Sequence, residues 1–178
     1  MKRFAPAFLA AALFAAPAFA ALKTGDKAPD FTAQASLGGK EFTFALADAR
    51  RKGPVVVYFY PKAFTKGCSA EAHAFAEAMP QFEAAGASVI GVSHDDIATL
   101  DKFSVSDCVN KFPVASDSDQ HIMTSYDAVL GGAHPEMANR ISYLVAPDGH
   151  VLAEYTDMDF SKHVDTMLAA LKSWKAGH

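Results

Sequence analysis

The sequence predicts an α/β domain in which a central mixed β-sheet is flanked by helices and carries an N-terminal β-hairpin. Three observations lead to this fold class. Residues 55–60 form a continuous apolar run, apolar residues recur every three or four positions after Cys68, and two strand-like runs flank a Pro-Asp-Gly turn near the C-terminus. Strand and helix patterns thus alternate, as they do where helices cover a sheet.

The first two elements are expected to form the hairpin. Residues 30–32 and 42–44 are rich in strand formers, and the glycines at 38–39 lie between them. Glycine tolerates the positive φ values that a tight hairpin turn requires. The next run, residues 55–60, is β-branched and aromatic without polar alternation, which predicts a central strand buried on both faces.

The pattern after Cys68 predicts an amphipathic helix. Its apolar face is formed by Ala72, Phe75, Met79 and Phe82. Pro80 lies inside this pattern, so we expect a kink or a break there. A second buried strand is expected at residues 88–93, and a polar helix from Asp96 to about Phe103.

The C-terminal part predicts two more strands and a closing helix. The strands cover residues 140–145 and 150–155, with a turn at 147–149. The helix is marked by Val164, Leu168, Leu171 and Trp174. A final antiparallel hairpin followed by a helix indicates a thioredoxin-like architecture, although a fold alone does not fix the chemistry.

The first twenty residues have the features of a secretory signal peptide. Two basic residues precede an apolar stretch at 4–20, which ends in the small-x-small pattern of a cleavage site. The alternative is a transmembrane anchor, but Pro6 and Pro17 interrupt the stretch and leave it short of the roughly 20 residues of a span. We expect cleavage after Ala20, one domain at 21–178, export to a bacterial periplasm, and no stable membrane insertion afterwards.

Composition excludes several classes of function. The 178 residues include 16 Lys+Arg and 20 Asp+Glu, a net charge of −4, and no basic block supports nucleic-acid binding. The two cysteines are too few for a disulfide-stapled mini-protein or a Cys-rich zinc site. The His-Asp-Asp cluster at 94–96 is the most metal-like group, and we interpret it as a polar loop after a strand.

Cys68 is the residue whose position points to chemistry. It follows a buried strand and lies in the first turn of the predicted helix, where unpaired N–H groups and a partial positive charge favour a thiolate. A thiolate attacks peroxides and becomes a sulfenic acid. The alternative is an inert buried cysteine. Thr65, three residues earlier, can direct its hydroxyl at the sulfur or cap the helix, and Pro61 can rigidify the loop or end the strand.

Residues around Cys68 resemble the peroxiredoxin signature. The pattern Pro61-x-x-x-Thr65-x-x-Cys68 matches the signature itself, and the run at 58–72 is similar to the peroxiredoxin Q group, also called bacterioferritin comigratory proteins, of the AhpC/TSA superfamily. Matches also occur at 25–31, 89–93, 112–117, 139–140 and 147–149. The resemblance covers nearly all of the chain after residue 20.

The resemblance implies an activity and a set of site residues. Cys68 would be the peroxidatic nucleophile, Thr65 would align the peroxide, and Pro61 would shield the sulfur. Arg140 matches the family's active-site arginine, whereas its position alone suggests a surface residue at the start of a strand. The substrates would be hydrogen peroxide or small organic hydroperoxides, and the reductant a thioredoxin- or glutaredoxin-like protein. The family implies no metal, haem or flavin, and many relatives are monomers.

The oxidised sulfur needs a partner thiol. In one peroxiredoxin Q subgroup the resolving cysteine lies five residues after the nucleophile, where this chain has His73. Some relatives resolve from a later helix, which makes Cys108 the candidate; otherwise Cys108 is a structural thiol and another molecule resolves Cys68. Two other functions stay open, a thioredoxin-like disulfide oxidoreductase and a metal- or haem-handling thioredoxin-fold module. The first normally uses Cys-x-x-Cys, and position 71 is a glutamate here.

Overall fold

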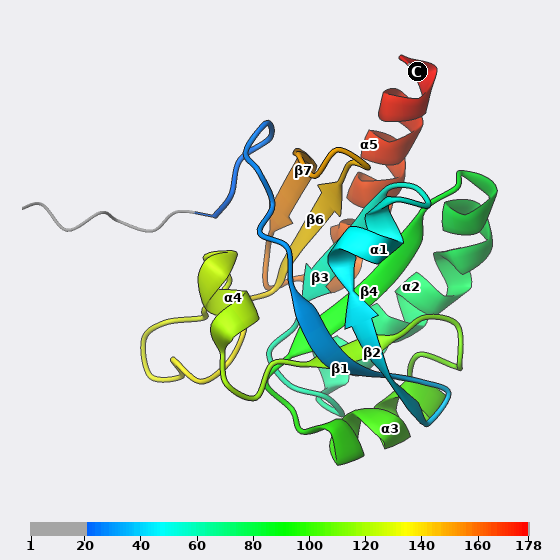
Figure 1. The fold of residues 1–178 in the computed structure, drawn as a ribbon. Coiled ribbons are helices and arrows are strands. Elements are labelled where there is room, and N and C mark those ends of the chain that lie inside the picture. The colour runs from blue at the N-terminus through cyan, green and yellow to red at the C-terminus, as the bar shows by residue number, and fades with distance from the viewer. Residues whose placement is uncertain (1–20, 178) are drawn as a thin grey trace, which may run out of the picture.

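The computed structural model describes residues 21–177, in which seven strands form a single mixed sheet (Figure 1). The strand order across the sheet is β2-β1-β5-β4-β3-β6-β7. The strands are β1 (Thr32–Leu37), β2 (Lys40–Ala45), β3 (Val55–Phe59), β4 (Ser88–Ser93), β5 (Val114–Ser116), β6 (Ile141–Val145) and β7 (Val151–Thr156). The predicted signal peptide lies outside the described residues, so its cleavage stays a prediction.

Helices cover both faces of this sheet. They are α1 (Leu46–Arg50), α2 (Lys66–Ala84), α3 (Ile97–Ser106), α4 (His121–Ser125), the 3-10 helix η1 (Phe160–Lys162) and α5 (His163–Ala176). One apolar cluster joins β3 to α2, α3 and α5, and a second joins the opposite face of the sheet to α1 and α4. The predicted mixed sheet with helices on both faces is confirmed, and the architecture is thioredoxin-like.

The N-terminal hairpin is present as predicted. β1 and β2 pair antiparallel from Thr32 opposite Ala45 to Leu37 opposite Lys40. The glycines between them have φ values of 59° and 73°, the left-handed region that a tight turn with two such residues requires.

β3 is the central strand that the apolar run predicted. It pairs in parallel with β4 and antiparallel with β6, and all five of its residues are buried. Because side chains alternate across a strand, Val56 and Tyr58 enter the cluster under α2, while Val57 and Phe59 enter the other cluster. Its C-terminal end leads directly into the loop that carries the predicted site.

Of the two outcomes predicted at Pro80, a kink or a break, the structure excludes the break. α2 continues through this residue to Ala84, so there is no break. A proline inside a helix costs about 3 kcal/mol, but Phe75, Met79 and Phe82 are buried on the same helix and their packing supports it across the proline. The structure also contains four short elements that the sequence analysis did not predict, α1, β5, α4 and η1.

Candidate active site

Cys68 lies in the first turn of α2, three residues after the N-cap residue Thr65. Its side chain is 2% exposed, so the sulfur is almost completely enclosed. The first amide groups of a helix have no acceptors within the helix, and the helix end carries a partial positive charge. The fold thus places the sulfur where the backbone stabilises a negative charge.

Arg140, directly before β6, brings a full positive charge to this sulfur. Its Nη2 lies 3.3 Å from Sγ of Cys68, and its Nε donates to the carbonyl oxygen of Met158 at 3.0 Å. The side chain is 4% exposed, not on the surface as its position in the sequence suggested. A Cβ atom at Gly67 would lie 3.3 Å from Nη2, so the glycine leaves room for the guanidinium. Burial disfavours its charge, yet the negative charges of Glu71 and Cys68 raise the pKa of Arg140.

Behind Arg140 lies a buried polar group that the sequence analysis did not select. Nη1 of Arg140 donates to Oε2 of Glu71, and the second carboxylate oxygen lies 3.7 Å from Nδ1 of His163. The same ring nitrogen lies 2.8 Å from Oγ of Ser142. Burial raises the pKa of Glu71 to about 7, against the opposing effect of Arg140. Desolvation lowers the pKa of His163.

A weak sequence signal for this group exists. Glu71 follows Cys68 by three residues and falls next to Ala72 on the apolar face of the helical pattern, where a charged residue needs a partner. His163 directly precedes Val164, the first apolar residue of the closing helix. The two residues are 92 positions apart, so only the fold shows that they meet.

Hydrogen bonds to Asp95, which follows β4, hold the loop before α2 in place. Oδ2 of Asp95 accepts a hydrogen bond from the backbone N–H of Ala63 at 2.7 Å and another from Oγ of Ser93 at 2.8 Å. Asp95 therefore belongs to the polar loop that was predicted, and it positions the segment between Pro61 and Cys68. An open pocket of about 720 Å³ lies against this segment, lined by Pro61 and its neighbours and by residues 94–96.

Pro61 and Thr65 lie on this loop as the sequence motif requires. Pro61 lies two residues after the end of β3 and is partly buried. Thr65 occupies the N-cap position, but its hydroxyl makes no capping bond and donates to the carbonyl oxygen of Lys62 at 2.9 Å. Simple capping is thus not its role here, and its alignment of a peroxide stays a prediction.

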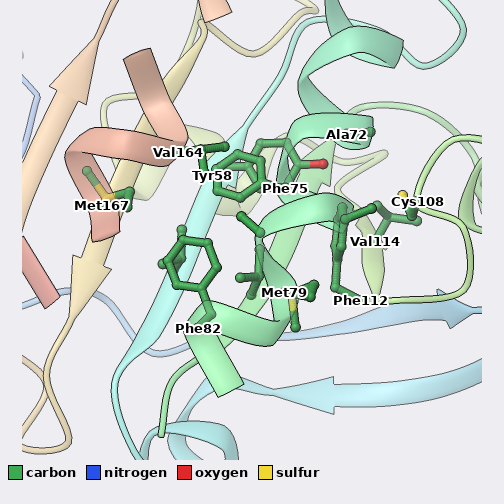
Figure 2. Packing of buried hydrophobic residues seen from close by; sticks show 14 of the residues in the cluster. Tyr58, Ala72, Phe75, Met79, Phe82, Cys108, Phe112, Val114, Val164 and Met167 are labelled. Atoms are coloured by element: carbon green, nitrogen blue, oxygen red, sulfur yellow. The ribbon is translucent and has the colours of Figure 1, made fainter. Parts of the chain in front are cut away.

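Cys108 lies just beyond the end of α3 in an apolar environment (Figure 2). It is completely buried and belongs to the same cluster as Phe112 and Val114. Desolvation, and to a lesser degree the charge of Asp107, raises the pKa of the Cys108 thiol. Both cysteines are free thiols in the structure, so a bond between Cys68 and Cys108 stays a prediction.

The described residues contain neither a cluster of metal-binding side chains nor a membrane-spanning helix. Within residues 21–177, no group of three or more His, Cys, Asp or Glu side chains is arranged to hold a metal ion. In that same part of the chain, no helix combines the length and the apolar character needed to cross a membrane.

The sequence matches a known family over most of its length. Residues 24–154 match the profile of the AhpC/TSA family. The chain is 33% identical over 126 residues to "Peroxiredoxin Bcp" of Xanthomonas campestris, covering 67% of this chain and 76% of the relative. It is 32% identical over 155 residues to "Peroxiredoxin Bcp" of Escherichia coli, covering 85% and 96%.

Solved structures give the same picture. A crystal structure of a mutant of Xylella fastidiosa PrxQ superposes with a TM-score of 0.78 at 26% identity, covering 88% of this chain and 99% of that one. Peroxidoxin BcpB of Mycobacterium tuberculosis superposes with a TM-score of 0.77 at 27% identity, covering 85% and 97%. These structures share the overall fold of this chain.

Proposed function

This chain belongs to the AhpC/TSA family as a peroxiredoxin similar to the Bcp and PrxQ proteins, and from that premise we propose that Cys68 is its peroxidatic nucleophile. The protein is a peroxidase oxidoreductase. Its proposed substrates are hydrogen peroxide and small organic hydroperoxides. The observation that carries the proposal is the 3.3 Å contact between Sγ of Cys68 and Nη2 of Arg140 at a helix N-terminus.

In the first step the Cys68 thiolate attacks one oxygen of the hydroperoxide. A sulfur–oxygen bond forms, the O–O bond breaks, and the second oxygen takes up a proton from solvent and leaves as water or an alcohol. Arg140 lies at contact distance of the sulfur, so it is positioned to stabilise both the thiolate and the charge on the leaving oxygen. The unpaired amides of the first turn, at Gly67 and Cys68, complement the bound peroxide.

Thr65 and Pro61 shape the approach to the sulfur. The single hydroxyl proton of Thr65 is directed at the carbonyl of Lys62, so its oxygen faces a substrate as an acceptor. An organic hydroperoxide has one O–H donor and hydrogen peroxide has two, and this acceptor can hold one of them. Pro61 has no N–H and a fixed φ, so it adds no competing donor to the wall of the site.

In the second step Cys108 is proposed to resolve the sulfenic acid. Its sulfur displaces the hydroxyl, a disulfide forms, and one water leaves. Complete burial keeps Cys108 a protonated thiol in this conformation, so the step requires local opening of the first turn of α2 and of the segment after α3. Cys108 and Cys68 belong to one apolar cluster on the same face of the sheet.

The remaining parts of the proposal concern the reductant and the location. A thioredoxin- or glutaredoxin-like dithiol protein reduces the disulfide and takes up the oxidising equivalents. The basic and apolar features of residues 1–20 support export to the periplasm, where that donor is supplied with electrons from across the membrane. The protein is proposed to act as a monomer and without a metal or an organic cofactor.

The test is peroxide consumption by the mature domain with excess dithiothreitol. Cys68→Ser should abolish turnover, whereas Cys108→Ser should retain the first reaction with peroxide. Peroxide consumption by Cys68→Ser at the wild-type rate would overturn the assignment of the nucleophile. Intact mass after one equivalent of peroxide tests the second step: loss of two hydrogens supports the Cys68–Cys108 bond, and a stable gain of one oxygen contradicts it.

A further inference from the structure

Four ionisable side chains form a buried row that begins at the reactive sulfur. Cys68 is 2% exposed, Arg140 is 4% exposed, and Glu71 and His163 are completely buried. With a thiolate, a guanidinium, a carboxylate and a neutral imidazole, this row would carry one uncompensated negative charge. Burying an uncompensated charge is costly, so the row calls for one additional proton.

One atom of the row shows where that proton belongs. Oε2 of Glu71 accepts a hydrogen bond from Arg140, but Oε1 is buried and has no hydrogen-bond partner. A buried acceptor without a donor is destabilising, and it is more so when it is charged. The ring nitrogen nearest to Oε1 is Nδ1 of His163, at 3.7 Å.

The hydrogen bonds of His163 define which of its nitrogens is free to accept. Nε2 lies 2.9 Å from the carbonyl oxygen of Asp157, which can only accept, so Nε2 carries a hydrogen. In the neutral ring Nδ1 then has one lone pair, which accepts from Oγ of Ser142 at 2.8 Å. Oε1 of Glu71 lies 3.7 Å from the same nitrogen, so a proton on Oε1 would share this acceptor with the serine hydroxyl. The ring is held further by Tyr155, whose centroid lies 4.8 Å away in an edge-on arrangement.

We propose that Glu71 carries a proton on Oε1, directed at Nδ1 of His163, when Cys68 is a thiolate, and that His163 is the positioning residue that stabilises this form. The row is then electrically neutral, and the charge of Arg140 acts on the sulfur. The inference rests on the proposed function only in treating Cys68 as the reacting thiol. The raised pKa of Glu71 and the lowered pKa of His163 agree with a proton on the carboxyl side.

The proposal makes ionisation of Cys68 depend on the state of Glu71. When Glu71 loses the proton, its charge competes with the sulfur for Arg140, and the thiolate is less stable. The titratable, charged and polar groups that face the pair come from every element packed around it. They are Cys68 on α2, Tyr58 on β3, Arg140 and Ser142 at β6, Tyr155 on β7, and Asp157 and Asp159 between β7 and η1.

The experiment measures the pH midpoint of Cys68 ionisation from the ultraviolet absorbance of its thiolate. The signal of each protein is taken as the difference from its Cys68→Ser counterpart, which removes tyrosine and Cys108. His163→Leu removes the acceptor, so Glu71 is more often charged, and the midpoint should rise by about one pH unit. Glu71→Gln mimics the protonated side chain and should not raise the midpoint.

The double variant separates a proton from simple packing. In Glu71→Gln there is no proton for His163 to hold, so adding His163→Leu should leave the midpoint unchanged. An equal rise in both backgrounds, or no rise in the single variant, would overturn the proposal. Matched controls are Glu77→Gln and His73→Leu, which change exposed residues of the same helix and should not move the midpoint.

A second measurement covers the case in which His163→Leu does not fold. The infrared C=O band of a protonated carboxyl group should be present in the wild-type protein near neutral pH and absent in Glu71→Gln. It should persist in Glu77→Gln, and its absence from the wild type would overturn the proposal. Both measurements are made without peroxide, so a Cys68 that titrates as described but does not reduce peroxide would contradict the proposed function alone.

Discussion

The two cysteines of this protein are both buried, yet they lie in opposite electrostatic environments. Cys68 is 2% exposed and contacts a guanidinium at a helix N-terminus, whereas Cys108 is 0% exposed and lies among aromatic and aliphatic side chains (Figure 2). The difference in solvent exposure is negligible, so exposure cannot decide which sulfur reacts. We propose that the charge next to each sulfur decides it, because Arg140 contacts Cys68, whereas Cys108 lies in an apolar cluster.

Removing the positive charge of Arg140 should reduce the difference in reactivity between the two cysteines more than any other single change. Arg140→Met should lower the rate of Cys68 oxidation by hydrogen peroxide by about 10²- to 10³-fold, the usual effect of losing one donor to the developing charge. The rate is measured by rapid quenching and mass spectrometry. Arg50→Met, which removes another partly buried arginine paired to Asp30, is the control and should leave the rate unchanged. A rate in Arg140→Met within twofold of the wild type would contradict the argument.

The raised pKa of Glu71, next to Cys68, should also make the free energy of unfolding depend on pH. The pKa of Glu71 is raised from 4.5 to about 7, so between these values the folded protein holds a proton that the unfolded chain has released. The stabilisation from this group is complete below pH 4.5 and is lost as the pH rises through about 7. The loss is at most about 1.4 kcal/mol per pH unit.

Urea unfolding at several pH values tests this prediction. Glu71→Gln should remove the downward slope of stability over that interval, and Glu77→Gln should keep it. His163, whose pKa is lowered, contributes with the opposite sign at acid pH, and comparison with the Glu71→Gln protein isolates the share of Glu71. An unchanged slope in Glu71→Gln would show that Glu71 is not the group that titrates.

A smaller effect is expected from releasing the loop between β3 and Cys68, which Asp95 holds by two hydrogen bonds. Asp95→Leu leaves the N–H of Ala63 and the hydroxyl of Ser93 without their acceptor, which should cost about 1–3 kcal/mol of stability and weaken peroxide reduction. Asp95→Asn retains an acceptor oxygen and should restore most of both. If the asparagine variant behaves like the leucine variant, the charge of Asp95 matters, and its role as an acceptor for the loop is wrong.

The smallest expected effect is the difference in stability between serine substitutions at the two cysteines. At position 68 a serine hydroxyl has Arg140 as a donor, so Cys68→Ser should change the free energy of unfolding little. At position 108 the hydroxyl enters an apolar cluster, and Cys108→Ser should be about 1–2 kcal/mol less stable than Cys108→Ala. Thermal or urea unfolding of the three variants measures both effects, and equal losses at the two positions would contradict the contrast.

Most of the fold follows from patterns within single segments. Three elements are predicted by a single local pattern each. β3 is predicted by its continuous apolar run, the turn between β1 and β2 by its two glycines, and α2 by apolar residues at every third or fourth position. β5 spans three residues and α4 five, which is too short for any periodicity to develop. The break predicted at Pro80 is absent because burial of the helix face around it outweighs the poor helix propensity of proline.

The site residues also divide into those that the sequence predicts and those that only the fold brings together. The position of Cys68 in the first turn of a helix follows from the sequence pattern alone, and the motif adds Thr65 and Pro61. Arg140 could be placed near the sulfur only through resemblance, because its own neighbourhood in the sequence suggests a surface residue. Glu71 and His163 were missed because their interaction depends on how α2 and α5 pack side by side, which no short segment encodes.

Enclosure of the guanidinium and the sulfur also bears on the medium in which the protein works. Dissolved ions screen charges that they can surround, and their effect is weak on charges that protein atoms cover. With Arg140 and Cys68 both almost fully covered, the reactivity of the sulfur should change little between dilute and concentrated salt. If the protein is exported as proposed, the ionic strength is set by its surroundings, and this arrangement should keep the chemistry at Cys68 nearly constant as that variable changes.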